Sequence, residues 1–151
     1  MPTHYAGDEA TRRALDAFIK ISRARKMLSF RTSRLLAEYE LTESQLGTLE
    51  ALYYLGPMCQ SEIGNKLLVS GGNVTMVVNN LEKRGLVSRK RDGKDRRQNT
   101  VSLTEKGQQL INELFPKHVQ NIADLLSILS PDEQDELGRL CKMLGRQTRD
   151  E

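Results

Sequence analysis

The stretch covering residues 60–107 constrains the fold most, because the spacing of its apolar residues changes twice. Apolar side chains first recur at helical intervals, then fall into two short extended runs, 86–91 and 99–103, and then return to helical spacing. Asp92-Gly93 between the extended runs is typical of a hairpin turn. The stretch therefore predicts a pair of helices, a β-hairpin and a further helix in uninterrupted succession.

Two helices precede the predicted hairpin. We expect the first over residues 60–67, with Ile63 and Leu67 inward, and place a break at residues 69–72, where two glycines follow a serine. The second helix ends before Gly85, which stands where a helix-terminating glycine belongs. Its inward side chains are Val74, Val77, Val78 and Leu81. A helix, a tight glycine-containing turn and a second helix are the elements of a helix-turn-helix.

Helices are also predicted on the N-terminal side of this stretch. Residues 11–39 carry apolar side chains at helical intervals with lysine and arginine between them, which indicates one long amphipathic helix. A shorter helix starts after Thr42, which forms a capping-box pattern with Gln45, and stops at Gly56-Pro57. Its inward side chains are Leu46, Leu49, Leu52 and Tyr53.

On the C-terminal side, Thr104 is expected to cap a long helix that bends or breaks near Pro116. Ser130, Pro131 and Glu133 combine an N-cap, a proline at the first helical position and an acidic third residue, so a final helix begins there. We expect this helix to bury Leu137, Leu140, Cys141 and Leu144. The whole chain is predicted to be mainly α-helical with a small β-hairpin.

The formal charge of +3 is unevenly distributed along the chain. Residues 83–97 carry eight basic side chains against two aspartates, and residues 12–34 carry eight against Asp16, so the remainder is acidic. Two basic segments on an acidic body favour a polyanionic partner. For residues 12–34, solvation of an outer helix face is the alternative, and we assign no DNA contact to Arg12 or Arg13.

The second helix of the pair carries the residue types that DNA recognition uses. In a winged helix this helix enters the major groove, while the hairpin follows the backbone or enters the minor groove. Asparagine pairs with adenine edges or phosphates, and threonine contacts a phosphate or a thymine methyl group. The candidate recognition residues are Asn73, Thr75, Met76, Asn79 and Asn80.

The tip of the hairpin holds Lys94, Arg96 and Arg97, and arginine is favoured in a narrow A·T minor groove. We expect Asp95 to accept hydrogen bonds from Arg97 and to orient its side chain. Taken alone, such a hairpin is equally compatible with a solvated charged loop. Its place directly after a helix-turn-helix favours a DNA-binding wing.

Four segments resemble the MarR family of winged helix-turn-helix transcriptional regulators: Val74-Thr75, residues 81–87, Asp95-Arg96-Arg97 and residues 101–107. The resemblance implies a single domain over residues 1–151. In that domain a winged helix-turn-helix DNA-binding lobe at residues 42–103 is flanked by dimerisation helices at residues 11–40 and 104–148. Many relatives carry a basic residue where this chain has Met76, so the operator is expected to differ from theirs.

The resemblance also implies a homodimeric repressor on a pseudo-palindromic operator in double-stranded DNA. Arg97 is then the minor-groove arginine and Asp95 its anchor, and a small-molecule effector or an oxidant releases the DNA. The effector site is unknown from the sequence. We expect a cytoplasmic protein with no cofactor, no metal site and no catalytic residues, and no run of residues is apolar enough to span a membrane.

Alternatives are open at several points. A winged helix that binds an acidic protein partner through its hairpin is a second function, and it would show no sequence-specific DNA affinity. Cys59 is an inert thiol or, as in some MarR-like sensors, a redox-sensitive one. Tyr53 and Tyr54 pack in the core or line a pocket for an aromatic effector. His4 and His118 are too few and too far apart for a zinc site.

Overall fold

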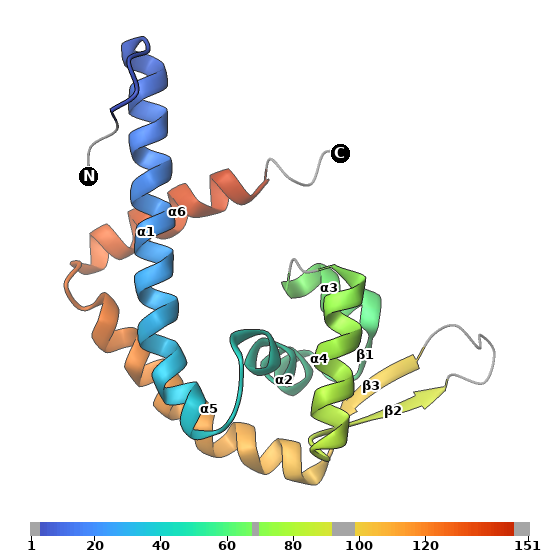
Figure 1. Cartoon of the computed structure of the whole chain (residues 1–151). Coiled ribbons are helices and arrows are strands. Elements are labelled where there is room, and N and C mark those ends of the chain that lie inside the picture. Colours follow the sequence, from blue (N-terminus) through green and yellow to red (C-terminus); the bar gives the residue numbers. More distant parts are fainter. Residues whose placement is uncertain (1–3, 68–69, 92–98, 147–151) are drawn as a thin grey trace. The chain divides into compact units, whose positions relative to one another are not determined.

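The computed structural model describes residues 4–67, 70–91 and 99–146. These residues form two compact units, one ending at Pro116 and the other beginning at Lys117. The elements, labelled in Figure 1, are α1 (Glu9–Glu38), α2 (Glu43–Leu55), β1 (Met58–Cys59), α3 (Gln60–Leu67), α4 (Gly71–Lys83), β2 (Val87–Arg91), β3 (Asn99–Leu103), α5 (Glu105–Leu126) and α6 (Pro131–Arg146). The prediction of a mainly helical chain with a small β-sheet is confirmed.

The sheet has three antiparallel strands in the order β1-β3-β2. Strands β2 and β3 pair from Val87 opposite Leu103 to Arg91 opposite Asn99, so the two arms of the predicted hairpin are confirmed. The turn itself, residues 92–98, lies outside the described residues. Strand β1 was not predicted, because two residues are too few to show an alternating pattern.

The core of the first unit lies where α2, α3 and α4 pack against one another and where α2 and α4 meet the sheet. Its buried side chains come from every element of this lobe, together with the end of α1 and the start of α5. They include Leu36, Leu46, Leu49, Leu52, Ile63, Val74, Val77, Val78, Leu81, Leu86, Val87, Val101, Ile111 and Leu114. The inward faces predicted for α2 and α4 are therefore confirmed, although Tyr53 is only half-buried.

Hydrogen bonds at the helix ends explain where the helices begin and stop. Thr42 and Gln45 form the predicted capping box of α2. After α4, Gly85 adopts a φ of 70°, and the amide of Leu86 donates to the carbonyl of Leu81 at 3.0 Å while that of Gly85 donates to Glu82 at 2.9 Å. This left-handed cap turns the chain directly from α4 into β2.

The break predicted at residues 69–72 was placed too far along the chain. The hydroxyl of Ser70 accepts a hydrogen bond from the amide of Asn73, so Ser70 is the N-cap and Gly71 and Gly72 belong to the first turn of α4. Helix α4 therefore starts at Gly71.

The start of α5 is held tightly against the beginning of the hairpin. Thr104 caps the helix as predicted, with its hydroxyl accepting from the amide of Gly107 and donating to the carbonyl of Gly85. A Cβ atom at Gly107 would lie 2.0 Å from the carbonyl oxygen of Leu86, so no larger residue fits without moving the backbone. Helix α5 then continues through Pro116, and the alternative of a break there is wrong.

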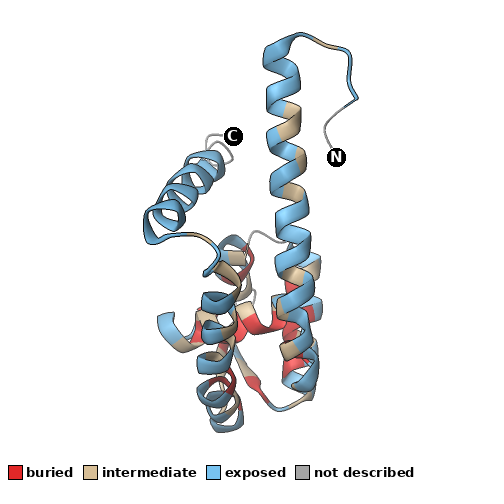
Figure 2. Cartoon of the chain, turned by 90° about the vertical axis from the view of Figure 1, so that its left-hand side faces the viewer, coloured by how far each residue is buried: buried red, intermediate tan, exposed pale blue. Residues whose placement is uncertain are grey.

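The terminal helices differ from this packed lobe. Along α1 only Leu36 is buried, and α6 has no buried residue among those described (Figure 2). Ser130 and Glu133 cap α6 reciprocally, as predicted. The expectation that α6 buries Leu137, Leu140, Cys141 and Leu144 is wrong for a single chain, because helical spacing shows that a face is apolar and not what covers it.

Within the described part of the chain, no helix combines the length and apolarity needed to cross a bilayer. Among the same residues, no group of three or more histidine, cysteine or acidic side chains is arranged to hold a metal ion.

Candidate nucleic-acid interface

Helix α4 turns one face into the core and the other toward solvent. Val74, Val77, Val78 and Leu81 form the buried face. The predicted recognition residues lie on the remaining faces, where Thr75, Met76 and Asn80 are exposed and Asn73 and Asn79 are half-buried. The helical repeat places Gly72, Met76, Asn79 and Lys83 furthest from the buried face. The outward surface of α4 is uncharged until Glu82 and Lys83 at its end.

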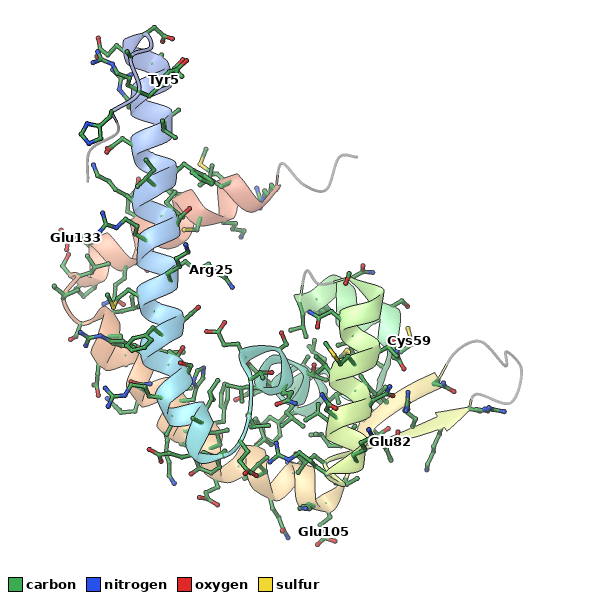
Figure 3. The ribbon with its side chains drawn as sticks, viewed as in Figure 1. Tyr5, Arg25, Cys59, Glu82, Glu105 and Glu133 are labelled. Atoms are coloured by element: carbon green, nitrogen blue, oxygen red, sulfur yellow. The ribbon has the colours of Figure 1, made fainter. Side chains whose placement is uncertain are left out.

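The orientation of this surface is fixed by a chain of polar contacts between three elements. Arg89 on β2 donates through Nε to Oε2 of Glu82 on α4 at 2.7 Å, and through Nη1 to Oε1 of Gln60 on α3 at 3.4 Å. Gln60 in turn donates through Nε2 to the hydroxyl of Thr75 on α4 at 3.1 Å. Figure 3 shows Glu82 near the junction of α4 with the hairpin. The strand of the wing is thereby joined to both helices of the helix-turn-helix.

Arg89 suits this bridging position because its guanidinium group offers several donors in a fixed plane. Its side chain is 26% exposed and that of Glu82 is 41% exposed, so the pair is only partly screened by water. The sequence marked Arg89 only as one member of a basic cluster and did not single out Gln60 or Glu82. No local signal identifies the three, because they meet only when the sheet packs against α4.

A hollow of about 440 Å³ lies between α3 and α4. Its lining residues are all polar or glycine: Gln60, Ser61, Gly64, Asn65, Gly71 and Thr75. No Cβ would meet another atom within 4 Å at Gly71 or Gly72, so the first turn of α4 is accessible to a ligand at backbone level. Helix N-termini favour anions because their amides point outward and the helix dipole is positive there. These features fit contact with a phosphate backbone.

Arg84, which belongs to the same basic cluster, has a structural role. Its guanidinium donates to the carbonyl of Glu40 at 2.6 Å and to that of Tyr39 at 2.9 Å, at the end of α1. Its own carbonyl accepts from Nζ of Lys106 on α5 at 2.9 Å. Glu40 has a φ of 54°, a conformation that few non-glycine residues adopt, and Arg84 holds the turn that contains it. The end of α4 is thus tied to the ends of α1 and α5.

The wing is described only in part. Lys90 and Arg91 are exposed at the end of β2. Lys94, Asp95, Arg96 and Arg97 lie outside the described residues, so the expected contact between Asp95 and Arg97 stays a prediction.

Cys59 lies half-buried at the N-terminus of α3, where it helps to cap the helix. Its amide donates to Oε2 of Glu62 at 2.8 Å, and its Sγ lies 2.9 Å from the hydroxyl oxygen of Ser61. The hydrogen bond from the amide of Cys59 lowers the pKa of the Glu62 carboxyl below its ordinary value. Cys141, expected in the core, is exposed in the single chain.

Comparison with known proteins agrees with this architecture. The sequence pattern of the MarR family matches residues 41–98. The uncharacterized HTH-type transcriptional regulator YkoM of Bacillus subtilis is 38% identical over 138 residues, which cover 91% of this chain and 90% of that protein. The HTH-type transcriptional regulator MhqR of the same organism is 33% identical over 135 residues, covering 89% and 93%.

Solved structures share the fold at lower sequence identity. AbsC, a MarR family transcriptional regulator from Streptomyces coelicolor, superposes with a TM-score of 0.85 at 22% identity, covering 99% of this chain and all of that one. Sco3205 from the same organism, solved in complex with DNA, gives 0.84 at 19% identity with 97% and 92% covered. NadR in complex with 4-hydroxyphenylacetate gives 0.72 at 21% identity with both chains fully covered. The chain belongs to the MarR family of winged helix-turn-helix, DNA-binding transcriptional regulators.

Proposed function

We propose that the protein is a homodimeric repressor that binds a pseudo-palindromic operator and releases it on a small-molecule or oxidant signal. The observation that carries the proposal is the solvent-facing side of α4, which is held to the wing strand through Glu82, Arg89 and Gln60. This face enters the major groove, with Asn73, Thr75, Met76, Asn79 and Asn80 toward the bases and backbone. Sco3205, which has the same fold, was solved in complex with DNA, and this supports DNA as the ligand.

The basic residues supply affinity in this scheme. Lys90 and Arg91 follow the phosphate backbone, and Lys94, Arg96 and Arg97 continue the wing toward the minor groove. Asp95 orients Arg97. Because cations contact phosphates, binding weakens steeply with salt.

The terminal helices form the dimer interface. Helix α1 exposes large apolar side chains such as Phe18 (66% exposed), and α6 exposes Leu137, Leu140 and Leu144. A second copy is the partner that their charges favour, because α1 carries eight basic residues against three acidic ones while α6 begins with four acidic residues in its first six. Pairing α1 of one protomer with α6 of the other covers both apolar faces and brings opposite charges together.

The proposed contact for an effector is a cluster of three aromatic side chains, Tyr53 and Tyr54 on α2 and Phe115 on α5. The ring of Tyr54 lies edge-on to Tyr53 at 4.9 Å and to Phe115 at 5.4 Å between centroids, yet Tyr54 is 59% exposed. An exposed ring of this kind offers a surface on which a flat aromatic acid stacks. The binding of 4-hydroxyphenylacetate to NadR makes phenolic acids the first compounds to test. Oxidation of Cys59 is the alternative signal, and Cys59→Ser would abolish a response to peroxide while leaving a response to phenolic acids.

Selection from a randomised duplex pool tests the function. We expect an enriched inverted repeat that the protein binds at least about 10³-fold more tightly than random DNA, with a steep dependence on salt. Arg97→Ala should weaken specific binding by about 1–3 kcal/mol, and Asp95→Ala should cause a similar loss through misorientation. A pool that shows no enrichment, with and without candidate effectors, would contradict the proposal and favour a protein partner for the basic hairpin.

A further inference from the structure

The outward face of α4 is chemically unusual for a surface that contacts DNA. Met76, which the helical repeat places near its centre, is 59% exposed. The helix has no arginine and no cation before Lys83, the last residue of the helix. A guanine is most often read by a bidentate arginine or lysine at its O6 and N7 atoms. The central part of α4 has no side chain for that contact.

The hydroxyl group of Thr75 is already used within the protein. It donates to the carbonyl of Gly71 at 3.1 Å and accepts from Nε2 of Gln60 at 3.1 Å. With its proton directed to Gly71, the hydroxyl has no donor left for a phosphate or a base. Besides the remaining lone pair of this hydroxyl, Thr75 offers a ligand above α4 its methyl group, and it directly precedes Met76 in the helix.

Apolar groups have one partner in the major groove, which is the C5-methyl group of thymine. We propose that α4 reads A·T pairs and that Met76 is the specificity-determining residue, packing with the Thr75 methyl group against a thymine methyl in each half-site. Asn79 and Asn80 lie within one helical turn and supply amides for the N6 and N7 atoms of adenine in the same or the adjacent pair. The inference rests on the proposed function, because it concerns the site that the helix contacts.

Replacement of thymine by deoxyuridine tests the inference, since it removes one methyl group and leaves the hydrogen-bonding edges unchanged. Each thymine of the selected half-site is replaced in turn, symmetrically in both half-sites, and affinity is measured for the native protein and for Met76→Ala. A buried methyl group contributes about a fourfold gain in affinity, and the symmetric replacement removes one methyl group from each half-site. We therefore expect about a 15-fold loss of affinity for the native protein at one thymine position. For Met76→Ala we expect less than a twofold difference between the two duplexes.

Met76→Leu is the matched control, because it keeps an apolar side chain of similar size and should retain the sensitivity to deoxyuridine. All three proteins should fold alike, since position 76 is exposed. The inference is overturned if no thymine methyl matters, or if Met76→Ala loses as much as the native protein at the same position. Neither result affects the proposed function, which fails only if no inverted repeat is enriched.

Discussion

The lobe formed by α2, α3, α4 and the sheet differs from the terminal helices in how completely its own side chains bury its apolar groups and pair its polar groups. In the lobe, Ile63, Val78 and Leu81 are fully buried and polar side chains such as Thr48 and Gln60 have partners within the chain. Helices α1 and α6 also begin with hydrogen-bonded caps, but many of their apolar side chains are exposed to solvent. Local signals thus define both regions, while only the lobe completes its core from one chain.

This contrast indicates that the lobe and the terminal helices have different structural roles. In the lobe, Arg84 ties the end of α4 to α1 and α5, and Arg89 ties it to the wing strand. The terminal helices expose apolar side chains of the kind that mark an interaction site.

The largest effect is expected from placing charge on the open face of α6. In the double variant Leu137→Asp/Leu140→Asp, a dimer would bury carboxylates at a cost of at least about 2 kcal/mol each. We expect sedimentation to give the 17.1 kDa mass of one chain, where the native protein gives twice that mass. The lobe should keep its thermal unfolding transition.

Lys142→Asp is the control for this experiment, because it places a carboxylate on the opposite, polar face of α6. It should remain dimeric. The terminal helices do not form a dimer interface if the native protein sediments as a monomer at all concentrations or if the double variant stays dimeric. Either result would contradict the interpretation that the exposed apolar faces of these helices are covered by a second copy.

A smaller effect is expected from a cavity in the lobe. Leu81 is fully buried among α4 and its neighbours, so Leu81→Ala should lower the free energy of unfolding by about 2–5 kcal/mol. Leu144→Ala on α6, which is 53% exposed in the single chain, should change the stability of an isolated protomer by less than about 1 kcal/mol. Chemical denaturation in the Leu137→Asp/Leu140→Asp background measures both. Equal losses would show that α6 is packed within its own chain.

Much of the fold was predictable because its boundaries are set by short-range chemistry. The amides of Gly85 and Leu86 end α4 through bonds to the carbonyls of Glu82 and Leu81. Ser130 and Glu133 start α6, again within a few residues. The same reasoning misplaced the start of α4, since a serine followed by two glycines reads equally well as a turn or as an N-cap with a permissive first turn. Strand β1 was missed because its partner strand is more than forty residues away and its two residues are too few to show an alternating pattern.

The candidate site was predictable in its elements and not in its connections. Helical periodicity placed Asn73, Thr75, Met76, Asn79 and Asn80 away from the core, and the structure agrees. The links from Arg89 to Glu82 and Gln60 depend on how β2 packs against α4, which no local pattern encodes. Charge alone grouped Arg84, Arg89 and Lys90 together, although the first two are held by carbonyls or by Glu82 and only Lys90 is fully available to a phosphate.

The smallest expected effect separates these two kinds of cation. Arg89→Ala releases the wing strand from α4 and should weaken operator binding by about 1–2 kcal/mol, roughly 5- to 30-fold in Kd, while binding to random DNA changes little. Lys90→Ala removes the same charge from a neighbouring exposed position, so it should weaken both kinds of binding alike and reduce the salt slope by about one. Glu82→Gln should follow Arg89→Ala with a smaller loss, since a neutral amide still accepts from Arg89. Titration of operator and random duplexes at several salt concentrations distinguishes the variants. If Arg89→Ala and Lys90→Ala behave identically, Arg89 is one more phosphate contact and does not position α4.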